Sequence, residues 1–165
     1  MSFVVGIDPG FTGGIAFLNS HSLFVFDTPT YETEFVKKVK GKQVTKKRNH
    51  MDLLKVSNII NEFDVGYAFL ELVSARENQG VTGMFRFGEN YGQWQGILAG
   101  LNIETHLVIP QIWKKHFKLL GKEKYDSLEL ARELFTGNLS DFKYKKNHGK
   151  AEAALIAKYG IDNKP

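Results

Sequence analysis

The feature that most constrains the fold is an apolar run near the N-terminus that ends in a carboxylate and a tight turn. Residues 4–7 are apolar apart from one glycine and predict a buried strand, which Asp8 ends. Pro9 and Gly10 follow, a pair typical of turns, so that a second strand can begin at once. An aspartate at the end of a buried strand costs free energy unless a cation or hydrogen bonds compensate its charge. Asp8 is therefore a candidate functional residue. The alternative is a purely structural role, in which the Asp8 carboxylate accepts hydrogen bonds from backbone N–H groups of the turn.

The succession of short apolar runs predicts an α/β fold built on one mixed sheet. Three strands come first, and their connections are so short that neighbouring strands must be antiparallel. These strands are expected at Ser2–Asp8, Gly13–Leu18 and Ser22–Asp27. Helical and strand patterns then alternate, which places helices on the faces of the sheet. We expect helices at 50–63 (with Asn49 as N-cap), 83–101, 110–117, 126–135 and 148–159, and strands at 65–71 and 103–109.

A second carboxylate, Glu71, ends a second apolar strand. Residues 65–71 are almost continuously apolar rather than alternating, which indicates burial on both faces and therefore a central strand. A mixed sheet of this order allows Asp8 and Glu71 to lie at the ends of adjacent central strands. The repetition of the pattern favours a functional role for both acids.

The last predicted helix carries two more polar residues of interest. Its sequence is rich in alanine, which lets a helix pack close to a sheet, and His148 and Glu152 lie four residues apart in it. That spacing places both side chains on one face of the helix, near its positively polarised N-terminus. The structural alternative is that Glu152 interacts with the helix dipole and His148 ends a loop.

Together, these side chains predict a metal-dependent hydrolase. Three carboxylates cannot all ionise in one cavity without cations, because like charges raise one another's pKa. Oxygen-rich clusters favour Mg²⁺ or Mn²⁺, and two such ions would balance Asp8, Glu71, Glu152 and one phosphodiester. A pair of ions can activate a water molecule and stabilise the leaving oxygen in phosphodiester hydrolysis.

Basic side chains are concentrated in one segment. The net charge of the chain is +4, and residues 37–48 carry no acid, so the rest of the chain is net acidic. Seven cations lie in this segment: Lys37, Lys38, Lys40, Lys42, Lys46, Lys47 and Arg48. We interpret residues 28–49 as a basic loop or loose hairpin that binds DNA phosphates, although a solvated loop is the alternative. Further candidate DNA contacts are Arg86, Lys114, Lys115, Lys145, Lys146 and Lys150.

Glycines recur every four residues in the long helix predicted at 83–101. Each interior glycine costs up to about 1 kcal/mol relative to alanine, so the pattern indicates that another backbone approaches closely. The glycines are Gly88, Gly92, Gly96 and Gly100. The neighbour is the protein's own sheet, the same helix of a second copy in a homodimer, or both.

Length and composition narrow the class of protein. A chain of 165 residues, 42% of them hydrophobic, is expected to form one domain with a proper core. We find no apolar run of membrane-spanning length and no signal peptide. The chain has no cysteine, which excludes disulfides and thiolate metal sites and fits a cytoplasmic location.

In their joint order, these motifs resemble the RuvC-like Holliday junction resolvases. The resemblance begins with residues 6–10 (Gly-Ile-Asp-Pro-Gly) and continues with Glu71 at a strand end and with the alanine-rich helix that bears His148 and Glu152. Residues 79–88, 91–96 and 110–115 are similar to family members carried by phages and mobile elements. The match covers almost the whole chain except the basic segment.

The resemblance implies a single nuclease domain, residues 1–165, with a ribonuclease-H-like fold: a mixed five-stranded sheet flanked by helices. It implies a homodimeric endonuclease that uses Mg²⁺ or Mn²⁺ to nick two opposed strands of a four-way DNA junction. Asp8 would bridge two metal ions, Glu71 would hold one, and Glu152 with His148 would serve the other. A phage-encoded enzyme would act in the cytoplasm of its bacterial host, and neither a membrane nor a small-molecule substrate is expected.

The sequence departs from the family at three points. His148 replaces the aspartate of many relatives, so it is either a ligand or the base that deprotonates water. Its distance of four residues from Glu152 is commonly three in cellular members. Bacterial relatives have an aromatic residue just after the second strand-end acid, which wedges the junction centre open, and residues 72–74 of this chain contain none. Phe85 or Phe87 is the candidate replacement.

Other functions remain open at this point. A nuclease of the same fold could cut RNA–DNA hybrids or general branched DNA, and a non-catalytic DNA-binding module would need the basic segment but not the strand-end acids. The opening turn also resembles that of the actin and sugar-kinase ATPases, but those proteins need two lobes, for which this chain is too short.

Overall fold

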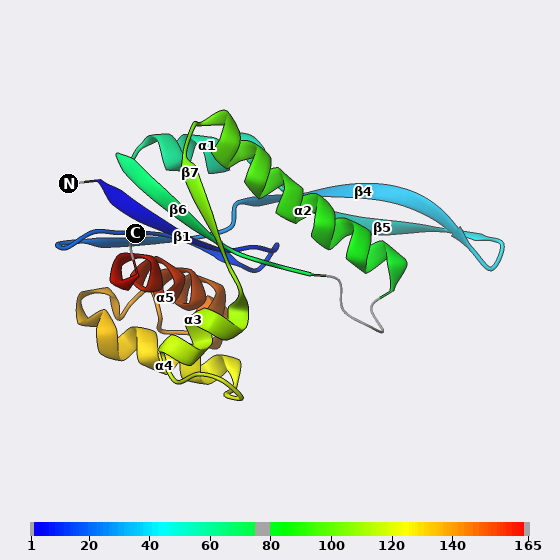
Figure 1. Cartoon of the computed structure of the whole chain (residues 1–165). Coiled ribbons are helices and arrows are strands. Elements are labelled where there is room, and N and C mark those ends of the chain that lie inside the picture. Colours follow the sequence, from blue (N-terminus) through cyan, green and yellow to red (C-terminus); the bar gives the residue numbers. More distant parts are fainter. Residues whose placement is uncertain (1, 75–79, 164–165) are drawn as a thin grey trace.

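The computed structural model describes residues 2–74 and 80–163, so residues 75–79, the last of which begins the 79–88 motif, lie outside the described part. Five strands form one sheet in the order β3-β2-β1-β6-β7 (Figure 1). β1, β2 and β3 pair antiparallel, whereas β6 runs parallel to both β1 and β7. The strands are β1 (Phe3–Asp8), β2 (Gly14–Leu18), β3 (Leu23–Asp27), β6 (Val65–Glu71) and β7 (Glu104–Val108). The predicted mixed five-stranded sheet is confirmed.

Helices cover both faces of this sheet (Figure 1). On one face lie α1 (Leu53–Asn61) and α2 (Val81–Gly100). On the other lie α3 (Pro110–His116), α4 (Lys124–Leu134) and α5 (His148–Asp162). Two short 3-10 helices, Thr136–Asn138 and Lys145–Asn147, connect α4 to α5. None of the helices in the described residues is long and apolar enough to cross a membrane.

Each face of the sheet has its own hydrophobic core. Between the sheet and α1 and α2, Phe17 and Trp94 are among the largest fully buried side chains. On the opposite face, Ala153 and Ala154 of α5 are fully buried in the core that includes Phe142. The two cores fix α2 and α5 on opposite sides of β1, which is the strand that Asp8 ends.

The first helix starts later than the sequence pattern predicts. Asp52 is its N-cap, and the Asp52 carboxylate accepts a hydrogen bond of 3.1 Å from the backbone N–H of Lys55. This bond lowers the pKa of Asp52. The predicted N-cap, Asn49, was wrong because the preceding strand continues through it, opposite Glu32.

The basic segment is more regular than predicted. β4 (Thr30–Val39) and β5 (Lys42–Met51) form a separate two-stranded antiparallel sheet with ten consecutive residue pairs. Figure 1 shows this ribbon extending well beyond the body of the protein, on the side to which α2 also extends. The predicted loop or loose hairpin is therefore an ordered β-ribbon.

The glycine stripe of α2 does not pack on the protein's own sheet. Apart from the adjoining backbone of α2 itself, a Cβ at Gly88, Gly92, Gly96 or Gly100 would meet no atom of the described residues within 4 Å. All four glycines are exposed, whereas Asn90, Trp94 and Leu98 form the buried face of the helix. Close packing within the protomer was the wrong explanation, and contact with a second copy stays a prediction.

Candidate active site

The first two predicted carboxylates end neighbouring parallel strands. β1 and β6 pair in a register that sets Ile7 against Leu70, so Asp8 and Glu71 follow as the last residues of the two strands. Both side chains are half-buried. The carboxyl ends of adjacent parallel strands lie at one edge of a sheet, which is where open α/β sheets bind their ligands.

Glycines in β1 and β2 allow α5 to approach this edge. A Cβ at Gly14 would lie only 2.8 Å from the carbonyl oxygen of Gly149, and a Cβ at Gly6 would collide with the backbone of Ala153 and Ala157. Such distances are shorter than van der Waals contact allows. Any side chain at Gly6 or Gly14 would therefore push α5 away from the sheet. The start of α5 is thereby held against the turn that follows Asp8.

All four predicted site residues line one cavity. It has a volume of about 680 Å³, and its lining includes Asp8, Glu71, His148 and Glu152. These residues come from β1, β6 and the first turns of α5, which are far apart in the sequence. The convergence that the sequence pattern predicted is therefore present in the fold.

Two of the carboxylates are held by residues of α3 and α4. The indole Nε1–H of Trp113 donates a hydrogen bond of 2.7 Å to Oε2 of Glu71. The hydroxyl of Ser127 donates one of 3.3 Å to Oε1 of Glu152, and the Lys114 ammonium lies 3.6 Å from the same oxygen. Glu152 is only 6% exposed, so these contacts supply compensation that its buried charge requires.

His148 lies where one of its ring nitrogens contacts the backbone. Its Nδ1 is 3.3 Å from the carbonyl oxygen of Lys145. A carbonyl oxygen only accepts hydrogen bonds, so this contact favours the tautomer with the proton on Nδ1. In that tautomer Nε2 is the basic nitrogen, suited either to a metal ion or to a water proton.

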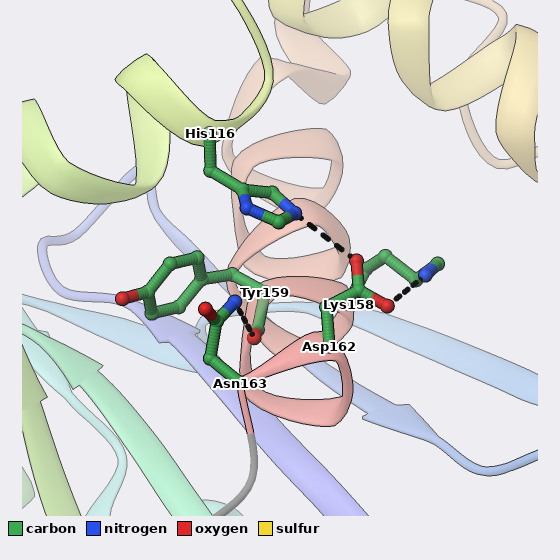
Figure 2. Close-up of polar contacts among 5 residues, drawn as sticks. All are labelled: His116, Lys158, Tyr159, Asp162 and Asn163. Atoms are coloured by element: carbon green, nitrogen blue, oxygen red, sulfur yellow. Dashed lines mark hydrogen bonds and ion pairs between the residues drawn. The ribbon is translucent and has the colours of Figure 1, made fainter.

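A polar cluster fastens α3 to the C-terminal end of α5 (Figure 2). His116 of α3 contacts the Asp162 carboxylate at 3.1 Å, and Lys158 pairs with the same carboxylate. Burial raises the pKa of Asp162, but hydrogen bonds with Lys158 and His116 outweigh it and hold the pKa below its ordinary value. The cluster holds the helix that presents Trp113 to Glu71.

The donor chemistry of the cavity fits a divalent cation. Three carboxylates and an imidazole line it, and oxygen donors of this kind suit Mg²⁺ or Mn²⁺. Among the described residues, however, no three histidine, aspartate or glutamate side chains are arranged to hold a metal ion. Glu71 and Glu152 instead bind Trp113, Ser127 and Lys114.

The candidate DNA contacts fall into two groups. The seven cations of residues 37–48 lie on the ribbon and are exposed. Lys115, Lys145 and Lys146, which lie elsewhere in the fold, are exposed as well. The other three are engaged by the fold: Arg86 donates to the carbonyl oxygen of Asn49 and lies over the ring of Phe11, Lys114 contacts Glu152, and Lys150 lies 4.0 Å from Asp141. A DNA role for all of them stays a prediction.

Three residues of the site are not among those predicted from the sequence, namely Trp113, Ser127 and Asn90. Asn90 is fully buried and lines the cavity, where its Oδ1 has no hydrogen-bond partner among the described residues. A polar residue on the buried face of α2, between Phe87 and Trp94, was the available signal.

The two candidate wedge aromatics differ in their surroundings. Phe85 is 73% exposed, whereas Phe87 is half-buried and lines the cavity that contains the four site residues. Both also line a second, apolar pocket of about 370 Å³ beside Val73 and Tyr91. Burial raises the pKa of Tyr91. Of the two rings, Phe85 is the one available at the surface.

Comparisons with known proteins bear on this arrangement. No protein-family model matches the chain. A curated relative, the chloroplastic Holliday junction resolvase MOC1 of Chlamydomonas reinhardtii, is 33% identical over 96 residues, which amount to 58% of this chain. The chain spans only 11% of the length of that relative.

Solved structures are similar over nearly the whole chain. A structure of RuvC from Thermus thermophilus has a TM-score of 0.54 and 15% identity, covering 97% of this chain and 95% of that chain. A structure of T. thermophilus RuvC in complex with a Holliday junction substrate has a TM-score of 0.49 and 11% identity, with 98% and 96% covered. The first of these two structures shows that the chain has the fold of RuvC, and the sequence similarity to a Holliday junction resolvase agrees with the family that its residues resemble.

Proposed function

We propose that the protein is a metal-dependent endodeoxyribonuclease that resolves four-way DNA junctions by paired nicks on opposed strands. The observation that carries the proposal is the convergence of Asp8, Glu71, His148 and Glu152 in one cavity. The RuvC fold and the sequence similarity to a Holliday junction resolvase support junction DNA as the substrate. Carboxylates that meet in a cleft of this kind suit hydrolysis of a phosphodiester.

The acids of the cavity would hold Mg²⁺ or Mn²⁺, and two ions per site is the number we propose. Asp8, Glu71 and Glu152 are the oxygen donors, with His148 as a further ligand or as the base. When bound, such ions activate the attacking water and stabilise the leaving oxygen. The negative charge of the cavity, which would otherwise repel a phosphate, is compensated at the same time.

The protein's own residues then orient these groups. The Trp113 N–H fixes one oxygen of Glu71 and leaves the carboxylate with a defined direction. Lys114 and Ser127 do the same for Glu152. In the tautomer that the carbonyl oxygen of Lys145 favours, His148 carries its proton on Nδ1, and Nε2 would be the nitrogen that takes a proton from water.

Paired nicks require two active sites, and a homodimer supplies them with twofold symmetry. The exposed glycines of α2 provide a surface on which a second copy of that helix could approach closely.

The absence of cysteine fits a reducing compartment, and we propose the cytoplasm, that of a bacterial host if the protein is phage-encoded.

The test is cleavage of end-labelled synthetic substrates, namely a four-way junction, a fork, a linear duplex and an RNA–DNA hybrid, with and without Mg²⁺. The proposal expects nicks at symmetric positions on two opposed strands of the junction, only when metal is present. Equal cleavage of the fork would point to a general branched-DNA nuclease, and preference for the hybrid would point to a ribonuclease. Binding without cleavage of any substrate would contradict an enzymatic role.

A further inference from the structure

The ribbon of β4 and β5 has a regular register that assigns each side chain to a face. Its ten residue pairs run without a break from Thr30 opposite Met51 to Val39 opposite Lys42. Lys40 and Gly41 form the tip, and both have positive φ (48° and 80°), as in a two-residue hairpin turn. Ten residues extend over about 34 Å, which is close to one turn of a DNA duplex.

The two faces of the ribbon differ in charge. Paired residues share a face and successive residues alternate between faces. The first face, which we name the cationic face, carries Lys37, Lys42, Lys46 and Arg48. Within residues 30–51, all of which the structure describes, this face carries no carboxylate.

The opposite face, which we name the compensated face, carries two lysines and two glutamates: Glu32, Glu34, Lys38 and Lys47. Lys47 and Glu32 form an ion pair of 2.7 Å, and the hydrogen bond between them raises the pKa of Lys47. Lys46 and Lys47 are neighbours in the sequence, yet they lie on faces of very different charge.

Aromatic side chains support the cationic face. The Arg48 guanidinium lies 4.7 Å from the centre of the Phe35 ring, in a cation–π contact. Tyr31 stacks on His50 at 5.3 Å, and the same His50 contacts the hydroxyl of Thr33 at 2.9 Å. These contacts hold side chains of the face in place before any ligand arrives.

The root of the ribbon adjoins the cavity. The backbone N–H of Thr28 donates to the carbonyl oxygen of Gly13, a residue of the cavity lining, at 3.2 Å. Met51, at the other strand's end, accepts from the amide of the lining residue Asn90 at 3.6 Å. Met51 is buried in the core on the compensated side of the ribbon, whereas Tyr31 on the cationic side is 50% exposed. The cationic face is therefore the one that faces away from the core at the root.

We propose that the cationic face of the ribbon binds the phosphate backbone of one duplex arm of the DNA substrate, and that the compensated face does not contact DNA. The identification of that duplex as a junction arm rests on the proposed function. Four unopposed cations, spread over about 20 Å of the ribbon from Lys42 to Arg48, match a polyanion in charge and in spacing. Of the seven cations predicted from the sequence, Lys38 and Lys47 are thus excluded from the contact.

The test compares two double variants that remove the same charge. Lys46→Ala with Arg48→Ala removes two cations from the cationic face, and Lys38→Ala with Lys47→Ala removes two from the compensated face. Binding to a fluorescent four-way junction is measured in EDTA, where a metal-dependent enzyme cannot cut, over a range of salt concentrations. The slope of log affinity against log salt should fall by about 1.8 for the first variant, at about 0.9 per phosphate contact, and should not change for the second.

The same slope for both variants would overturn the proposal, because it would mean that only net charge matters. Thermal unfolding followed by circular dichroism checks that both double variants fold like the wild type. A third double variant, Lys37→Ala with Lys42→Ala, repeats the test on the cationic face nearer the tip. Cleavage by the wild type is scored separately. A face-dependent slope without junction cleavage would contradict the proposed function alone, whereas junction cleavage with equal slopes would contradict the ribbon proposal alone.

Discussion

Trp113 belongs both to the core and to the candidate active site. Its ring is fully buried, as the helical pattern of residues 110–117 predicts. Its N–H reaches Glu71, which lies 42 residues earlier in the chain. That contact could not be predicted, because periodicity identifies the buried face of a helix but not the atom of another element that meets it. Asp8, Glu71, His148 and Glu152 were predictable because each interrupts an apolar pattern at a strand end or a helix start.

Trp113→Phe keeps an aromatic ring in the core and removes the donor to Glu71. We expect the Mg²⁺ concentration that gives half-maximal cleavage to rise, or activity at limiting Mg²⁺ to fall, by about 10–100-fold. A Mg²⁺ titration of junction cleavage measures this. Saturating Mg²⁺ should restore part of the lost activity, because the substitution affects the orientation of the ligand and not its identity.

Trp94→Phe is the matched control. Trp94 is also fully buried, but its indole Nε1 has no hydrogen-bond partner among the described residues. This substitution should alter packing without shifting the Mg²⁺ dependence. Equal Mg²⁺ titrations for the wild type and Trp113→Phe would show that the Trp113 N–H has no positioning role.

At the scale of elements, the position of α3 depends on its attachment to α5. His116 and Lys158 both bind the Asp162 carboxylate, and these groups are about one-third exposed (34%, 33% and 27% for the three side chains). Exposed pairs contribute little to stability, so the cluster sets the position of the helix more than it stabilises the fold.

Asp162→Asn should lower the free energy of unfolding by at most about 1 kcal/mol near neutral pH. The pKa of Asp162 is below its ordinary value of 3.8, so its contribution is present above that pH and is lost as the pH falls through the lowered pKa. Urea unfolding of both proteins at several pH values measures the difference. A stability difference that grows as the pH falls below 3.8 would contradict this sign.

The glycine stripe of α2 illustrates what a sequence pattern leaves open. The repeat predicts a close approach of another backbone, and the exposure of all four glycines leaves a second copy of the chain as the neighbour that we propose.

Because the described residues leave open space at Gly92, Gly92→Leu should fold normally and weaken the dimer. Light scattering measures the mass, with the smaller change Gly92→Ala as control. A Gly92→Leu dimer as stable as the wild type, or a monomeric wild type, would contradict the proposal.

The ribbon was the least predictable element. Its strands are mostly polar on both faces because they lie outside the body, so hydrophobic alternation is weak there. The signals that remain are the Lys40-Gly41 turn and scattered β-branched or aromatic residues such as Phe35, Val36 and Val44. The same lack of alternation misplaced the start of α1, since the strand extends to Met51.

At the scale of the whole molecule, the fold followed from the order of its elements. Three antiparallel strands, followed by alternating helices and strands, allow few arrangements of a mixed sheet, and Asp8 and Glu71 at strand ends already indicated neighbouring positions. The approach of α5 was expected from its alanines, although the glycine contacts at Gly6, Gly14 and Gly149 that permit it are tertiary. In the function that we propose, the acidic cavity is the part that cuts DNA and the cationic ribbon is the part that binds it.

The most direct measurement is cleavage and binding of a labelled four-way junction by Asp8→Asn in Mg²⁺. Asparagine keeps the size of the side chain and removes its charge. We predict that the wild type nicks two opposed strands, and that the variant cuts neither yet binds the junction at least as tightly, because repulsion of the phosphate is relieved. Junction cleavage by Asp8→Asn at the wild-type rate would contradict the assignment of this cavity as the active site.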